Sequence, residues 1–90
     1  MAGESRAAAS KESVVELVEL IAKALVEKPD EVEVSSIEAG RTQTIELSVD
    51  DSDLGKVIGR KGRTAKSIRT LLGVAGAKMD RRLQLEILEP

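Results

Sequence analysis

Two segments of alternating hydrophobicity flank a stretch of helical periodicity, and this order constrains the fold more than any other feature of the chain. Their apolar residues recur at every second position: Ile45, Leu47 and Val49 in the first segment, Leu83, Leu85 and Ile87 in the second. A period of two is typical of β-strands. Residues 50–82 leave room for a helical crossover, so we predict parallel strands joined by a right-handed connection.

The residues before these segments predict a helix and a further strand. Ser13 and Glu16 have the spacing of a capping box, which places the helix start at Ser13, and Pro29 ends the helix. Between them the apolar residues follow helical spacing: Val14, Leu17, Val18, Ile21 and Leu25. A first strand should then pair with the next one through a hairpin loop at residues 39–41. Its apolar positions are Val32, Val34 and Ile37.

The crossover itself contains two helical patterns. Asp51, Ser52 and Asp53 offer N-cap chemistry for a short helix over residues 54–58. A longer helix follows, with an apolar side that comprises Ala65, Ile68, Leu71, Leu72, Ala75 and Met79. The element order is α-β-β-α-α-β, which predicts an α+β fold in which a three-stranded mixed sheet carries helices packed on one face.

Missing residue types exclude several classes of function. The 90 residues contain no Cys and no His, which rules out thiolate metal sites and the usual general base. There is no Phe, Tyr or Trp either, so no ring can stack on a base. No apolar run reaches the roughly 20 residues that span a bilayer, and the start lacks the apolar centre of a secretion signal. We expect a cytoplasmic, non-enzymatic domain at 11–90 without cofactor or metal, after a disordered tail at 1–10.

Positive charge is concentrated in one segment of an acidic chain. The formal net charge is −2, and residues 1–53 carry 5 basic and 13 acidic side chains. Residues 54–79 carry 7 basic side chains and no acidic one. A segregated distribution favours a surface that binds a polyanion, although a solvated helix face would give the same pattern.

The sequence GRKG lies between the two helical patterns of the crossover. Glycine at both ends allows a tight turn and the close approach of another backbone. The next helix would present free N–H groups and its positive dipole end at the same point, beside Arg60, Lys61 and Arg63. These features favour an anion-binding loop over a plain helix–turn–helix corner.

Other glycine-rich and acidic motifs do not match residue by residue. Arg60 stands where a P-loop that begins at Gly55 needs glycine, and Val57 stands where the dinucleotide motif has glycine. The acidic run at residues 50–53 misses the spacing of a calcium loop. A second glycine pair at residues 73–76 lies in an uncharged apolar pattern, which indicates close helix packing or a helix end.

The segment GKVIGRKGRTAKSIRTL, set between two helices in an α-β-β-α-α-β chain, resembles a KH domain of the second topological type. Residues 11–89 are similar to the small stand-alone bacterial KH proteins of the YlqC or KhpA family. The resemblance implies a nucleic-acid clamp that accepts about four single-stranded nucleotides across a narrow groove. The clamp residues that it implies are Gly59, Arg60, Lys61 and Gly62.

The resemblance also implies an aliphatic groove that holds bases without aromatic stacking. The apolar candidates are Val57, Ile58 and Ile68, all of which equally fit the helical core pattern. The candidates for phosphate contact are Lys56, Arg63, Lys66 and Arg69, which could instead solvate an exposed helix. Arg41 matches the family's variable loop and would add a contact.

Family members pair with themselves and with a larger KH-containing protein. The resemblance therefore implies single-stranded RNA and a homodimer or heterodimer partner, with no membrane or small-molecule substrate. We predict an RNA chaperone or post-transcriptional accessory factor of the bacterial cytoplasm. The alternative is a KH-like pairing module whose nucleic-acid binding is incidental, which Leu88 on the outer side of the last strand and the small residues 73–77 favour.

Overall fold

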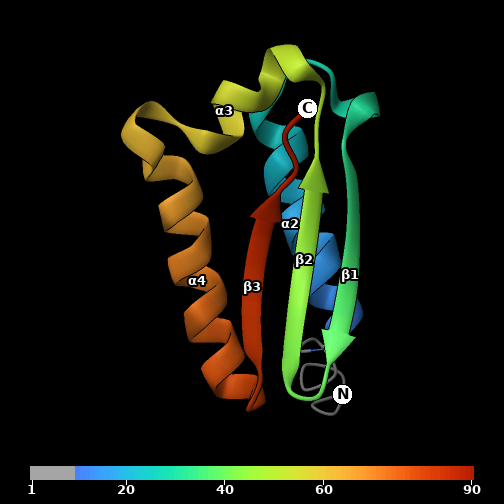
Figure 1. The fold of residues 1–90 in the computed structure, drawn as a ribbon, viewed down its shortest axis with the longest axis vertical. Coiled ribbons are helices and arrows are strands. Elements are labelled where there is room, and N and C mark those ends of the chain that lie inside the picture. Colours follow the sequence, from blue (N-terminus) through green and yellow to red (C-terminus); the bar gives the residue numbers. More distant parts are fainter. Residues whose placement is uncertain (1–9) are drawn as a thin grey trace, which may run out of the picture.

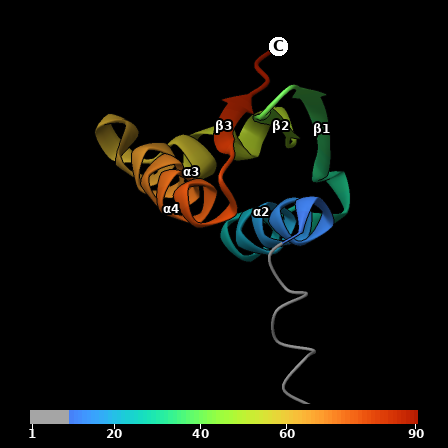
Figure 2. The same ribbon diagram turned by 90° about the horizontal axis from the view of Figure 1, so that it is seen from below.

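A three-stranded sheet carries its helices on a single face (Figures 1 and 2). The computed structural model describes residues 10–90, so the disordered tail expected at 1–10 falls, apart from Ser10, outside the described residues. The elements are α2 (Lys11–Leu25), β1 (Glu33–Ala39), β2 (Thr42–Ser48), α3 (Leu54–Ile58), α4 (Arg63–Met79) and β3 (Arg82–Ile87). Short 3-10 turns cover Pro29–Glu31, Asp51–Asp53 and Arg60–Gly62. The predicted α+β order is confirmed.

The strand order is β1-β2-β3. β1 and β2 are antiparallel, and Val34 lies opposite Leu47. β2 and β3 are parallel, with Ile45 opposite Leu85, which confirms the pairing predicted from the length of the crossover. The hairpin turn contains Gly40, whose φ of 61° lies in the left-handed region that glycine adopts without steric cost.

The core between sheet and helices is aliphatic. Its largest fully buried apolar side chains are Ile45, Leu47, Leu72, Val18 and Val57. Two residues assigned to this core from periodicity lie elsewhere, because Leu71 is 58% exposed and Ile37 is 54% exposed. Leu71 follows the helical stripe only at its margin, and Ile37 points to the open face of the sheet, so neither meets the opposite layer.

The first helix begins earlier than the capping box predicted. Ser10 is its N-cap, and the Oγ atom of Ser10 accepts a hydrogen bond from the backbone N–H of Ser13 at 3.1 Å. Ser13 therefore lies inside α2. The helix ends at Leu25, and Pro29 opens the following 3-10 turn instead of stopping α2 directly.

Gly76 allows the C-terminal half of α4 to approach the start of β3. An added Cβ atom at Gly76 would lie 2.5 Å from the carbonyl oxygen of Arg81 and 3.2 Å from Leu83 Cγ. The chain turns back through Asp80, which has a φ of 55°, and the N–H of Arg81 donates to the carbonyl of Gly76 at 2.8 Å. The glycine pair at 73–76 thus serves packing at one of its two positions, since Gly73 has open space around it.

Replacing Gly76 by alanine should lower the free energy of unfolding by about 1–3 kcal/mol, because the new methyl group would push α4 away from the backbone at Arg81. Gly73→Ala is the matched control in the same helix. It should be neutral or stabilising by up to about 1 kcal/mol, since alanine favours the helix over glycine. Urea unfolding followed by far-UV circular dichroism measures both. Equal stabilities for the two variants would contradict the close approach of α4 to β3.

Candidate nucleic-acid interface

The buried carboxylate of Asp53 fixes the position of α3. Its side chain is almost fully buried, and its two oxygens accept the backbone N–H groups of Glu27 at 3.2 Å and Lys28 at 3.0 Å. Lys56 Nζ lies 3.4 Å from the same carboxylate. The run 51–53 was expected to supply the N-cap of α3, and Asp53 holds that position without a side-chain cap hydrogen bond. Its carboxylate joins the segment after α2 to the turn before α3, and Asp50 caps that turn by accepting the N–H of Ser52 at 3.0 Å.

These contacts determine how the two acidic groups titrate. Burial alone would raise the pKa of Asp53, but the N–H groups of Glu27 and Lys28 and the Lys56 ammonium hold this pKa below its usual value. Hydrogen bonds from Ser52 likewise lower the pKa of Asp50. Both carboxylates are therefore occupied by donors from this chain.

The loop of residues 59–62, here called the glycine loop, has an unusual backbone conformation. Gly59 ends α3 with a φ of 81°, and its N–H donates to the carbonyl of Gly55 at 2.8 Å. Lys61 has a φ of 57° and Gly62 a φ of 74°. A non-glycine residue in the left-handed region costs about 1–2 kcal/mol, so the surrounding structure must stabilise the conformation of Lys61.

Gly59 is required by space as well as by its backbone angle. An added Cβ atom would lie 2.7 Å from the backbone nitrogen of Thr64 and would overlap the Thr64 side chain. Gly62 has open space around it, so only its φ favours glycine. The loop therefore packs against the first turn of α4. Thr64 was not predicted as a site residue. Only its position, two residues after Gly62, could have indicated from the sequence that it contacts Gly59.

The cations around the loop have no acidic partner within the described residues. Arg60, Lys61, Arg63 and Lys66 are exposed, and no carboxylate of residues 10–90 lies within 4.0 Å of their nitrogens. Among residues 10–90, no side chain caps the N-terminus of α4. Backbone N–H groups, the positive end of the helix dipole and unpaired cations thus meet at one point, which is an arrangement that binds anions.

The free edge of β3 continues this surface along α4. Arg69 reaches from α4 to the strand, where its Nε and Nη2 atoms donate to the carbonyl oxygen of Leu85 at 3.4 and 3.3 Å. A shallow hollow of about 490 Å³ follows the edge. Its lining includes four polar residues that were not predicted from the sequence: Thr44, Arg82, Gln84 and the acidic Glu86. The alternation of β3 points Arg82 and Gln84 outward, and this pattern in the sequence could have indicated both residues.

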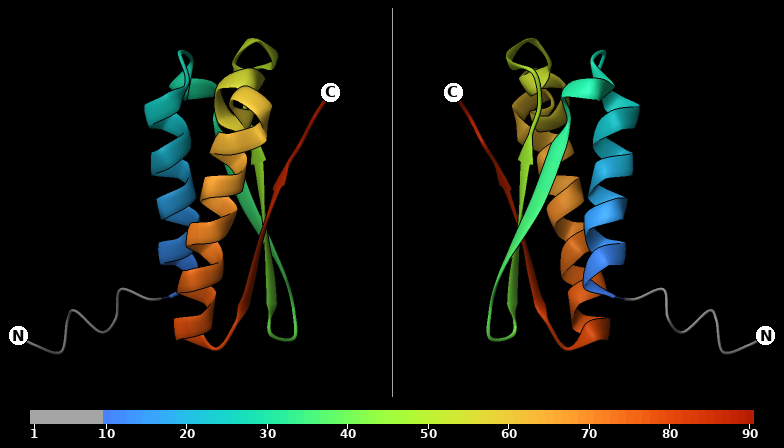
Figure 3. Two further views of the ribbon diagram at one scale, coloured as in Figure 1. Left: turned by 90° about the vertical axis from the view of Figure 1, so that its left-hand side faces the viewer. Right: turned by 90° about the vertical axis from the view of Figure 1, so that its right-hand side faces the viewer.

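Three expected site residues lie elsewhere. Val57 is completely buried and Ile68 is 5% exposed, so their side chains belong to the core and offer no surface to a base. Of the apolar candidates, only Ile58 is partly exposed. Arg41 lies in the β1–β2 hairpin, at the opposite end of the molecule from the loop (Figure 3), where its Nη1 atom pairs with Asp80 at 3.3 Å. The structure therefore does not bring Arg41 to the loop.

A family model for the KH domain of KhpA and KhpB matches residues 15–87. The chain belongs to this KH-domain family. It is 55% identical over 75 residues to the RNA-binding protein KhpA of Borreliella burgdorferi, covering 83% of this chain and 92% of that protein. The RNA-binding protein KhpA of Aquifex aeolicus is 51% identical, with 82% and 94% covered, and that of Listeria monocytogenes is 45% identical, with 82% and 97% covered.

The architecture of this KH domain is consistent with the type II fold, as the resemblance implied. The family match agrees with the expectation of a binding protein instead of an enzyme. Across residues 10–90, the helices lack the length and apolar character needed to cross a membrane.

Asp53→Asn should lower the stability of the KH domain near neutral pH and flatten its dependence on acid. The pKa of Asp53 in the folded state lies below its unfolded value of about 3.9. Ionised Asp53 therefore stabilises the fold above that pH, and this contribution is lost as the pH falls through the folded pKa. Urea midpoints between about pH 6 and pH 3 should fall more steeply for the wild type. Parallel curves for the two proteins would contradict this assignment.

Proposed function

We propose that this KH domain binds single-stranded RNA through the glycine loop and the groove between α4 and the edge of β3. The observation that carries the proposal is the loop itself, in which Arg60, Lys61 and Arg63 surround an uncapped helix N-terminus without acidic partners in residues 10–90. The names of the relatives as RNA-binding proteins support the same reading.

In this mechanism, the loop fixes phosphates and the groove receives bases. Backbone N–H groups at the start of α4 and the side chains of Arg60 and Lys61 would bind consecutive phosphates of about four nucleotides. Lys56, Lys66 and Arg69 would neutralise the flanking backbone. The bases would lie over Ile58 and along the edge of β3, where Gln84 offers hydrogen-bonding groups. Phosphate contacts position a strand without reading it, so sequence preference should be limited.

A single grip on four nucleotides is weak, and this favours an accessory role. With 2–4 phosphate contacts, the affinity should fall with the logarithm of salt concentration by about 0.7 for each contact. Linking two such domains in a pair raises the effective concentration of the second site. We therefore propose an RNA chaperone or accessory factor of a bacterial cytoplasm that works as a pair, with itself or with a larger KH-containing protein.

The double variant Arg60→Asp/Lys61→Asp should weaken RNA binding about tenfold or more, which is about 1.4 kcal/mol. The salt dependence should become shallower by about 0.7 for each lost contact. Anisotropy of a fluorescent single-stranded RNA measures both. Lys23→Asp/Arg41→Asp has the same charge change on exposed positions, one on α2 and one in the hairpin at the opposite end of the domain, and should bind nearly as the wild type does.

Thermal unfolding of all three proteins must agree before their affinities are compared. If the two double variants lose affinity equally, the loop has no special role and net charge alone governs binding. If neither loses affinity, the loop is not the RNA clamp, and pairing becomes the leading function.

Pairing is the second candidate function, and the helical layer carries the observation that favours it. α2 and α4 lie side by side on the outer surface (Figures 2 and 3), and five of their large apolar side chains are exposed. These are Leu17, Leu20, Leu25, Leu71 and Val74. The charged residues of α4 are all basic, whereas α2 carries more acidic than basic residues. A twofold arrangement of two copies that places α4 on α2 would match both apolar and charged surfaces.

Leu71→Glu should abolish concentration-dependent self-association, because it places a charge in this apolar face. Leu88→Glu is the control on the open face of the sheet, where Leu88 is 42% exposed, and should leave association unchanged. Sedimentation velocity over a range of protein concentrations distinguishes them. The opposite result would move the pairing surface to the sheet, and a wild type that stays monomeric would exclude pairing with itself.

A further inference from the structure

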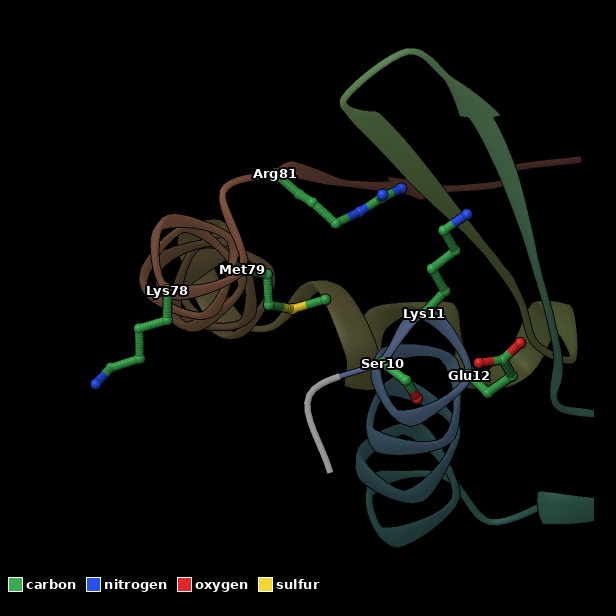
Figure 4. A pocket seen from close by; sticks show the side chains of 6 residues that line it. All are labelled: Ser10, Lys11, Glu12, Lys78, Met79 and Arg81. Atoms are coloured by element: carbon green, nitrogen blue, oxygen red, sulfur yellow. The ribbon is translucent and has the colours of Figure 1, made fainter. Parts of the chain in front are cut away.

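A pocket of about 450 Å³ lies between the N-terminus of α2 and the C-terminus of α4, at the end of the domain opposite the glycine loop (Figures 1 and 4). α4 has 17 residues and rises about 1.5 Å per residue, so roughly 25 Å separate the pocket from the loop. The residues that line the pocket are Ser10, Lys11, Glu12, Lys78, Met79 and Arg81.

Two cations of this pocket share a single carboxylate. Lys11 Nζ lies 2.6 Å from Glu38 Oε1, and Arg81 Nη2 lies 3.8 Å from the same oxygen. Figure 4 shows the Lys11 and Arg81 side chains reaching toward one another from α2 and from the start of β3, while Lys78 extends away. One carboxylate therefore faces two cations, which leaves these three side chains with a net positive charge.

The guanidinium of Arg81 also lacks hydrogen-bond acceptors. The side chain is 18% exposed, and among residues 10–90 its Nε and Nη2 atoms are buried without a hydrogen-bond partner, as is the acceptor Oε1 of Gln43. A buried charged donor that makes no hydrogen bond costs more free energy than the 1–3 kcal/mol typical of a neutral one. Gln43 is completely buried, and its Nε2–H donates to the carbonyl of Lys11 at 3.3 Å, which ties the start of α2 to the sheet.

We propose that this pocket is a second phosphate-binding site. A phosphate group would accept hydrogen bonds from Arg81 and Lys11, and charge-assisted bonds of this kind are the strong ones. The N-terminus of the 15-residue helix α2 lies at the same pocket, where Ser10 already accepts the N–H of Ser13 and the positive end of the helix dipole favours an anion. Lys78 adds positive charge, and Glu12 is the one acidic residue of the lining.

The phosphate group has two possible sources with the same chemistry. It can belong to an RNA strand that leaves the groove and continues past the end of α4, an assignment that rests on the proposed function. It can also be a free phosphate, which requires no RNA at all. The first measurement detects the site with inorganic phosphate, and the second identifies the source.

Inorganic phosphate, added at constant ionic strength to the ¹⁵N-labelled full chain, should shift the Arg81 Nε–Hε resonance and the α2 amides beside Lys11 in a saturable way. Arg81→Gln should abolish the shifts of the α2 amides. Lys11→Gln should reduce them and serves as the second variant if Arg81→Gln unfolds. Arg41→Gln, at the same end but paired with Asp80, should leave them unchanged. Shifts that do not saturate, or that persist in Arg81→Gln, would overturn the site.

RNA of four and of ten nucleotides separates the two sources. If the site takes the RNA backbone, Lys11→Gln should weaken binding of the longer RNA several-fold and leave the shorter one unaffected. If it takes free phosphate, Lys11→Gln should leave both RNA affinities unchanged, while the wild type still shows the phosphate-induced shifts. Arg60→Asp/Lys61→Asp should weaken both RNAs and preserve the shifts. If the proposed function is wrong, this loop variant should bind RNA as the wild type does. That outcome does not depend on the result at Arg81.

Discussion

The parallel pairing of β2 with β3 is the constraint on which the rest of the structure depends. Two neighbouring strands that run in the same direction need a connection that returns along the whole sheet. α4 makes this return, so α3 and the glycine loop must lie at the end of the sheet where β2 finishes (Figure 1). The same geometry sets α4 beside the free edge of β3, where Arg69 reaches the strand and a shallow hollow follows the edge.

The fold also divides the positive charge of the chain between two places. Lys61 and Lys78 belong to one basic segment of the sequence, yet α4 carries them to opposite ends of the domain. At the far end, Lys78 lines the same pocket as Lys11 and Arg81 from other parts of the chain, although its side chain extends away from theirs. A polyanion that follows α4 therefore meets cations at both ends, while the acidic residues are left mostly on α2, the sheet and the connecting turns.

Local sequence patterns predicted most of the fold, because the type of a helix, strand or turn depends mainly on residues that are close in the sequence. The alternation around Ile45 and Leu85, the turn at Gly40 and the short helix Leu54–Ile58 all appear as expected. The glycine loop was predicted from the same kind of evidence, since a change of helical pattern, two glycines and two cations occur within a few positions. Helix starts and ends were less certain: Ser10, and not Ser13, caps α2.

The sequence by itself determined the element order, the parallel crossover, the aliphatic core and a basic loop between two helices. Only the tertiary structure decided which apolar residues face inward, so that Val57 and Ile68 are buried while Leu71 is exposed. It also decided the partners of charged groups, since Asp53 binds the N–H of Lys28, 25 residues away, and Arg41 meets Asp80, 39 residues away. Periodicity describes one element at a time, whereas burial and ion pairing depend on how separate elements come together.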